Sequence, residues 1–76
     1  MVNLREKILR AQINYYQGLI CKHQQNVEIY LNQPVGIGEH PQFAEEIDKQ
    51  LSAITCATDK IKAIDTHYPN EDDIPF

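Results

Sequence analysis

Features that define several protein classes are scarce in this chain of 76 residues. Its two cysteines, Cys21 and Cys56, are too few for the disulfide scaffold of a small secreted domain. It has no apolar run long enough for a signal segment or a membrane span. The alternation of apolar and polar residues that is typical of β-strands is also missing. We therefore expect a cytoplasmic protein without strands and without a membrane partner.

Residues suited to catalysis or metal binding are not arranged for those roles. Cys21 and His23 lie two positions apart, so on a helix they point about 200° away from each other and cannot act as nucleophile and base. His40 and His67 have no neighbours at the spacing of metal ligands. The turn Gly36-Ile37-Gly38 lacks the lysine and the hydroxyl residue of a P-loop. The sequence predicts no enzyme, no metal and no cofactor.

The chain does contain two long helical segments separated by helix-breaking residues. Asn3 can cap a first helix, which we expect to run from Leu4 to about Leu31. Proline and glycine residues between positions 34 and 38 end it. A second helix should begin at His40-Pro41 and end near Asp65. We therefore predict an all-α fold with a helical domain over residues 1–66 and a flexible, disordered acidic tail over residues 67–76.

The two predicted helices differ in their apolar surface. The second has one main stripe of Phe43, Ile47, Leu51, Ile54, Ile61 and Ile64, with Ala57 and Thr58 filling the same side. The first has two adjoining stripes, one of Leu4, Ile8, Ala11, Tyr15 and Leu19, the other of Leu9, Ile13, Tyr16, Ile20, Val27 and Leu31. Two such stripes span roughly half of the helix circumference, so one antiparallel neighbour would leave apolar surface exposed.

Three arrangements would cover that surface. A hairpin of two long amphipathic helices could dimerise into a four-helix bundle, or the helices could break, for example near Gly18, and fold back within one chain. The second face could also belong to a different protein. Because each stripe is nearly continuous, the sequence favours the helical hairpin. Tyr15, Tyr16 and Tyr30 are then core-edge residues, with base stacking as the alternative.

The charge of the chain is unevenly distributed. Seven basic residues against eleven acidic ones give a net charge of −4, which argues against general affinity for nucleic acid. Before the central loop, however, Arg5, Lys7, Arg10 and Lys22 outnumber the acids. These four form a thin basic strip, which is either a solvated face or a weak nucleic-acid site.

The C-terminal residues have the form of a short linear ligand. They are Asp72, Asp73, Ile74, Pro75 and Phe76. The acids can steer the segment to a basic surface, and Phe76 can fill a pocket while its carboxylate meets an arginine. This ending resembles the C-terminal tip of bacterial single-stranded-DNA-binding proteins, which docks many repair and replication enzymes. The resemblance is confined to the tip, because nothing upstream has the strand pattern of an OB-fold.

A second resemblance covers most of residues 3–66. It rests on a capped first helix, a loop and a second helix in that order. The helix begins Leu4-Arg5-Glu6-Lys7-Ile8-Leu9-Arg10, and the loop is Asn32-Gln33-Pro34-Val35-Gly36-Ile37-Gly38-Glu39-His40-Pro41. This pattern resembles a small helical protein of T4-type bacteriophages that is encoded beside the UvsW recombination helicase. The resemblance implies a small helical bundle in phage recombination and replication. It also implies similarity to the helical nucleic-acid-binding modules of RecQ-type helicases.

Together these observations predict a non-enzymatic adaptor in phage DNA metabolism. Its helical face and its tail would dock a DNA replication or repair protein or a helicase, and it would associate with itself as a homodimer. The alternative is a small nucleic-acid-binding module accessory to a helicase, which would use Arg5, Lys7, Arg10 and Lys22.

Overall fold

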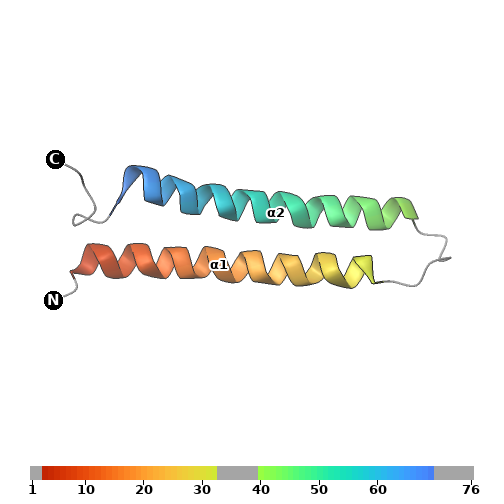
Figure 1. Cartoon of the computed structure of the whole chain (residues 1–76), viewed down its shortest axis with the longest axis horizontal. Helices are drawn as coiled ribbons and strands as arrows, with labels where there is room; N and C mark the ends of the chain where they lie inside the picture. The colour runs from red at the N-terminus through yellow and green to blue at the C-terminus, as the bar shows by residue number, and fades with distance from the viewer. Residues whose placement is uncertain (1–2, 33–39, 70–76) are drawn as a thin grey trace.

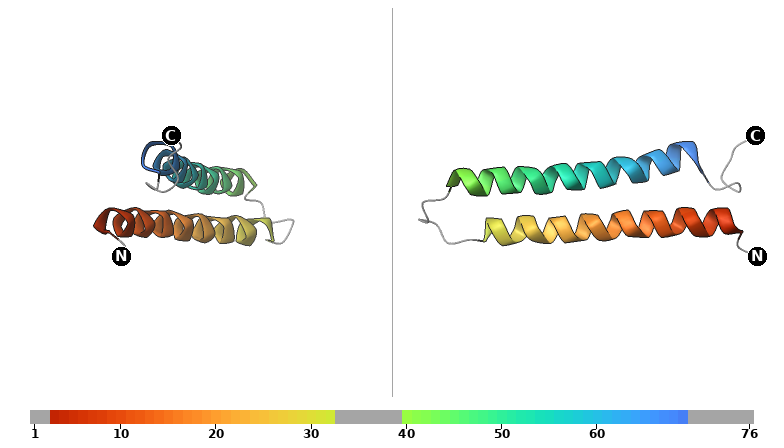
Figure 2. Two further views of the ribbon diagram at one scale, coloured as in Figure 1. Left: turned by 60° about the vertical axis from the view of Figure 1, so that its left-hand side comes forward. Right: turned by 180° about the vertical axis from the view of Figure 1, so that it is seen from behind.

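The computed structural model describes residues 3–32 and 40–69 and shows two long helices packed side by side in opposite directions (Figure 1). Helix α1 spans Leu4–Leu31 and helix α2 spans His40–His67. The two other views show the same antiparallel pair, with the start of α1 beside the end of α2 (Figure 2). The predicted all-α helical hairpin is confirmed. The predicted acidic segment from position 70 onward lies outside the described residues.

Local sequence explains where the helices begin and end. Asn3 has extended backbone angles, and its Oδ1 accepts a hydrogen bond of 2.8 Å from the backbone N–H of Glu6, as a helix N-cap does. At the other end of α1 the side chain of Asn32 donates to the carbonyl of Glu28 over 2.7 Å. Helix α2 ends at His67, two residues later than the predicted end near Asp65, and Pro69 follows, which has no N–H to continue it.

The contact between the helices follows a strict repeat of four and three residues on each helix. We call this contact the inner seam; its members are Leu9, Ile13, Tyr16, Ile20, His23, Val27 and Tyr30 on α1, and Phe43, Ile47, Gln50, Ile54, Ala57, Ile61 and Ile64 on α2. All of them are half-buried except Ala57, which is fully buried. An average spacing of 3.5 residues is the repeat of left-handed coiled coils, and it keeps one side of each helix facing its neighbour.

Two details of the predicted stripes differ from the structure. Leu51 was predicted to lie in the stripe of α2 but is 49% exposed, because it follows Gln50, which occupies the seam position. Leu31 was placed on a stripe of α1 and is 63% exposed at the helix end. The alternative of a break near Gly18 is not observed, since α1 is continuous from Leu4 to Leu31.

Within residues 3–32 and 40–69, the hairpin is a single layer of two helices without a closed core. Its extents are 58 × 22 × 14 Å, so the molecule is long and thin. Among the described residues, Ala57 is the only buried hydrophobic side chain. A two-helix layer of this kind buries little apolar surface, so the outer faces of the helices decide what the molecule can bind.

Candidate partner-binding surfaces

A second apolar row runs along α1 on the side that α2 does not cover. We call it the outer stripe and define it by Leu4, Ile8, Ala11 and Tyr15. Leu19, which was predicted to continue this stripe, is half-buried instead. Leu4 is 72% exposed, Ile8 54% and Tyr15 59%. These residues are also spaced four, three and four apart, so they form one continuous line on the helix. The prediction that one antiparallel neighbour leaves apolar surface of the first helix exposed is confirmed.

The same line continues toward the loop with a different character. After Tyr15 the repeat passes through Gly18, Lys22 and Gln25 before it reaches Ile29, which is 57% exposed. The apolar part of the line is therefore concentrated at the open end of the hairpin, where α1 begins. A partner that binds through apolar contacts finds its continuous surface there.

The four predicted nucleic-acid residues do not form one patch. At about 100° per residue, Lys22 falls in line with Leu4, and Arg5 and Lys7 border the outer stripe on either side. Arg10 lies on another side of α1 and lines a groove there. The acidic residues of α1, Glu6 and Glu28, point away from the outer stripe. The border of the outer stripe is therefore basic.

Only one of the three tyrosines considered for base stacking is free to stack on a ligand. Tyr30 packs against Phe43, with ring centroids 5.9 Å apart. Tyr16 lies in the inner seam, and Lys60 Nζ sits 5.5 Å from the centroid of its ring. Tyr15 lies in the outer stripe beside Tyr16, at a centroid distance of 5.5 Å, and remains mostly exposed. A row of stacking aromatic residues is therefore not present on the described helices.

Arg5 connects the start of α1 to the end of α2. Its Nη2 donates a hydrogen bond of 3.2 Å to the carbonyl oxygen of Pro69, the last described residue before the acidic tail. Its Nη1 is buried and has no hydrogen-bond acceptor among the described residues. A buried guanidinium nitrogen without an acceptor is costly. Sequence reasoning identified Arg5 only as part of a basic strip, because this contact depends on the register of the two helices.

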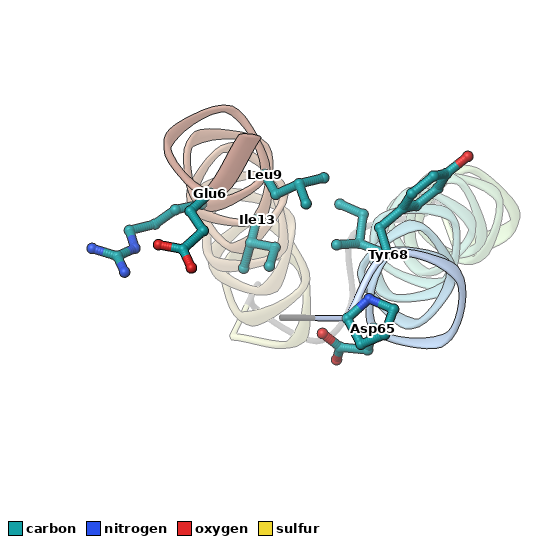
Figure 3. A pocket seen from close by; sticks show the side chains of 8 residues that line it. Glu6, Leu9, Ile13, Asp65 and Tyr68 are labelled. Carbon is teal, nitrogen blue, oxygen red and sulfur yellow. The ribbon is translucent and has the colours of Figure 1, made fainter. Parts of the chain in front are cut away.

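A groove of about 370 Å³ opens between the helices at the same end of the molecule (Figure 3). Leu9 and Ile13 reach into it from α1; Asp65 of α2 and Tyr68, the residue after the end of α2, border it on the other side. Its complete lining is Glu6, Leu9, Arg10, Ile13, Ile64, Asp65, Tyr68 and Pro69. Two carboxylates and one guanidinium at its rim make this groove a poor receptor for an acidic ligand, unlike the outer stripe with its basic border.

Hydrogen-bonded polar side chains interrupt the inner seam near its middle. We call them the polar level; they are His23 and Gln50 of the seam and the neighbouring Asn26. Gln50 Oε1 accepts a hydrogen bond of 3.0 Å from Asn26 Nδ2 and lies 2.6 Å from His23 Nδ1. With Gln50 Oε1 as the shared acceptor, Nδ1 of His23 carries the proton. His23 therefore has a structural partner across the seam. Polar residues at seam positions specify register in coiled coils, and sequence reasoning did not foresee this level because it requires the pairing of α1 with α2.

The remaining chemistry of the described residues is that of an exposed surface. Cys21 and Cys56 are both exposed free thiols. No group of three or more His, Cys, Asp or Glu side chains within residues 3–32 and 40–69 could hold a metal ion. A hydrogen bond from Lys49 to Glu46 raises the pKa of Lys49, and this pair is a solvent-exposed contact within one helix. Neither described helix is long and apolar enough to cross a membrane.

Comparison with known proteins gives no significant match to a family model, a curated protein or a solved structure.

Proposed function

We propose that this protein is a non-enzymatic adaptor in the recombination, replication or repair of phage DNA, working in the cytoplasm of the infected host. The observation that carries the proposal is the outer stripe, an apolar row at the open end of a hairpin that has no closed core. Exposed apolar rows of this kind are typical of surfaces that bind another helix or protein. The phage setting comes from the resemblance of residues 3–66 to the small protein encoded beside the UvsW helicase.

The helical surface and the C-terminal residues have separate roles in this proposal. The outer stripe binds a partner helix or a second copy of the chain, and the second copy would complete a four-helix bundle. Asp72, Asp73, Ile74, Pro75 and Phe76 dock a replication or repair enzyme or a helicase. In this docking the two acids steer the segment, and Phe76 anchors it.

Capture of proteins from infected host cells tests the docking role. The intact chain should retain replication or repair enzymes that accept the tip of single-stranded-DNA-binding proteins. Deletion of Phe76 should weaken binding to such an enzyme by an order of magnitude or more, about 2 kcal/mol for a hot-spot aromatic residue. Gln17→Ala, at an exposed position of α1, provides a control. Equal binding by the intact and Phe76-deleted chains would contradict the proposed docking.

The second candidate function is an accessory nucleic-acid-binding module. It is favoured by the basic border of the outer stripe, formed by Arg5, Lys7 and Lys22 around the exposed Tyr15. A salt titration separates the two functions, because contacts to phosphate lose affinity steeply with salt whereas an apolar anchor does not. A steep salt slope that falls when Lys7 and Lys22 are changed to Gln would favour the nucleic-acid module.

A further inference from the structure

We propose that residues 70–76 fold back onto the open end of the outer stripe of the same chain and cover Leu4 and Ile8 between the basic residues Arg5 and Lys7. The C-terminal segment would then have two alternative binding sites, its own helix and the partner enzyme. This regulatory consequence rests on the proposed docking function, whereas the intramolecular contact itself does not depend on it.

The first argument is position. The hydrogen bond from Arg5 Nη2 to the carbonyl of Pro69 holds the last described residue beside the first turn of α1. Seven residues follow Pro69, from Asn70 to Phe76. Seven extended residues reach at most about 24 Å, while Ile8 is only about 4.5 Å farther along α1 than Arg5. The segment is therefore long enough to turn back and place its last residues on Leu4 and Ile8.

The second argument is the match of chemistry. The segment has three acids, Glu71, Asp72 and Asp73, followed by an apolar end. The receiving surface has two exposed apolar side chains, Leu4 at 72% and Ile8 at 54% exposure, bordered by basic residues. Burial of Phe76 against these side chains removes apolar surface from water, and the acids meet Arg5 and Lys7. The neighbouring groove is less suitable because Glu6 and Asp65 line it.

The third argument is the unmet hydrogen-bonding capacity of Arg5. Its Nη1 is buried and has no acceptor within residues 3–32 and 40–69. The residues that follow Pro69 are the part of the chain tethered next to it, and they supply carboxylates within a few positions. A carboxylate bound to this nitrogen would form a charge-assisted hydrogen bond and remove the cost of a buried unpaired donor.

Nuclear Overhauser measurements on the full-length chain test the contact directly. We expect cross peaks from the ring protons of Phe76 to the methyl groups of Leu4 and Ile8, and a shift of those methyl resonances in Phe76→Ala. A sample that mixes labelled and unlabelled chains distinguishes contacts within one chain from contacts between chains. The proposal is overturned if no such cross peaks occur, if they arise only between chains, or if they connect Phe76 to Leu9, Ile13 and Ile64 instead.

A pair of charge variants tests the role of the basic border. Lys7→Gln should reduce the Phe76 cross peaks several-fold, and so should added salt. Lys22→Gln is the matched control, because it makes the same change on the same helix about 25 Å from Arg5, at the limit of what the tail can reach. If the cross peaks of Phe76 are equally strong in Lys7→Gln and in the unmodified chain, Lys7 does not help to bind the C-terminal segment, and its assignment to the binding site is wrong.

The outcome of this test is distinct from that of the adaptor proposal. Absent cross peaks, together with enzyme capture that still depends on Phe76, would reject the intramolecular contact and leave the docking function. Cross peaks without Phe76-dependent capture would support the intramolecular contact and reject the docking function.

Discussion

The inner seam and the outer stripe of α1 have the same spacing but different surroundings. Both repeat at four and three residues along one helix. The seam residues are half-buried against α2, whereas Leu4 and Tyr15 of the outer stripe are 72% and 59% exposed. The periodicity of apolar residues therefore identifies which sides of a helix are apolar, but not which neighbour covers each side. In this molecule one side is covered by the same chain, and the other is available to a ligand.

The two rows also differ in how they accommodate polar residues. In the inner seam His23 and Gln50 form one hydrogen-bonded level, which the neighbouring Asn26 joins through its bond to Gln50. The outer stripe keeps its polar residues at its border and beyond Tyr15, where Lys7 and Lys22 are exposed. A covered row must satisfy its polar groups internally, whereas an exposed row can use charge to select a partner.

The largest expected loss of stability comes from a comparison in which the same negative charge is placed once in the inner seam and once in the outer stripe. Ile54→Asp puts a carboxylate into the inner seam and should unfold the protein, at a cost of several kcal/mol that is comparable with the total stability of so small a domain, about 5 kcal/mol. Ile8→Asp, in the outer stripe, should change stability much less. Thermal melting followed by circular dichroism measures both. Equal melting curves for the two variants would show that the assigned faces of α1 and α2 are wrong.

The next effect concerns self-association through the outer stripe. Sedimentation should show dimers at micromolar to millimolar concentration, because the two helices leave Leu4, Ile8 and Tyr15 exposed and a second copy can displace residues 70–76 from Leu4 and Ile8. Tyr15→Asp should weaken the dimer at least tenfold, which is about 1.4 kcal/mol. Gln17→Asp, at an exposed position on another side of α1, is the control. A strictly monomeric protein, or equal effects of the two substitutions, would mean that the outer stripe does not bind a second copy.

The sequence predicted those parts of the structure that depend on local chemistry. The cap at Asn3, the end of α1 at Leu31 and the second apolar face of α1 follow from residue type and helical spacing. These features need no knowledge of the partner helix.

The features that were missed depend on the pairing of α1 with α2. The hydrogen bond from Arg5 to Pro69 and the contact of His23 with Gln50 join residues that are far apart in sequence. Leu51 was assigned to the apolar stripe because its residue type fits, yet the 3.5-residue repeat places Gln50 in the seam. Hydrophobic character alone therefore could not predict the register that positions the candidate site.

A smaller effect should come from the polar level of the inner seam. Gln50→Ala removes the acceptor shared by His23 and Asn26, and we expect a loss of about 1 kcal/mol because both donors are only half-buried and can turn to water. Gln24→Ala, at an exposed position of α1, should stay within about 0.5 kcal/mol of the unmodified chain. Urea unfolding measures both values. If Gln50→Ala costs no more than Gln24→Ala, the polar level contributes nothing to the pairing of the helices.

The smallest effect is expected at Gly18, where the apolar part of the outer stripe ends. An added Cβ would meet nothing within 4 Å in the hairpin, so Gly18→Ala should stabilise α1 through helix propensity, by up to about 1 kcal/mol. Urea unfolding of the monomer gives this value, and sedimentation of the same variant shows whether the dimer is affected. We expect unchanged association, because the proposed contact lies between Leu4 and Tyr15 and a partner there does not reach Gly18. Weaker association would mean that a second helix approaches α1 closely at Gly18, and it would extend the binding surface toward the loop.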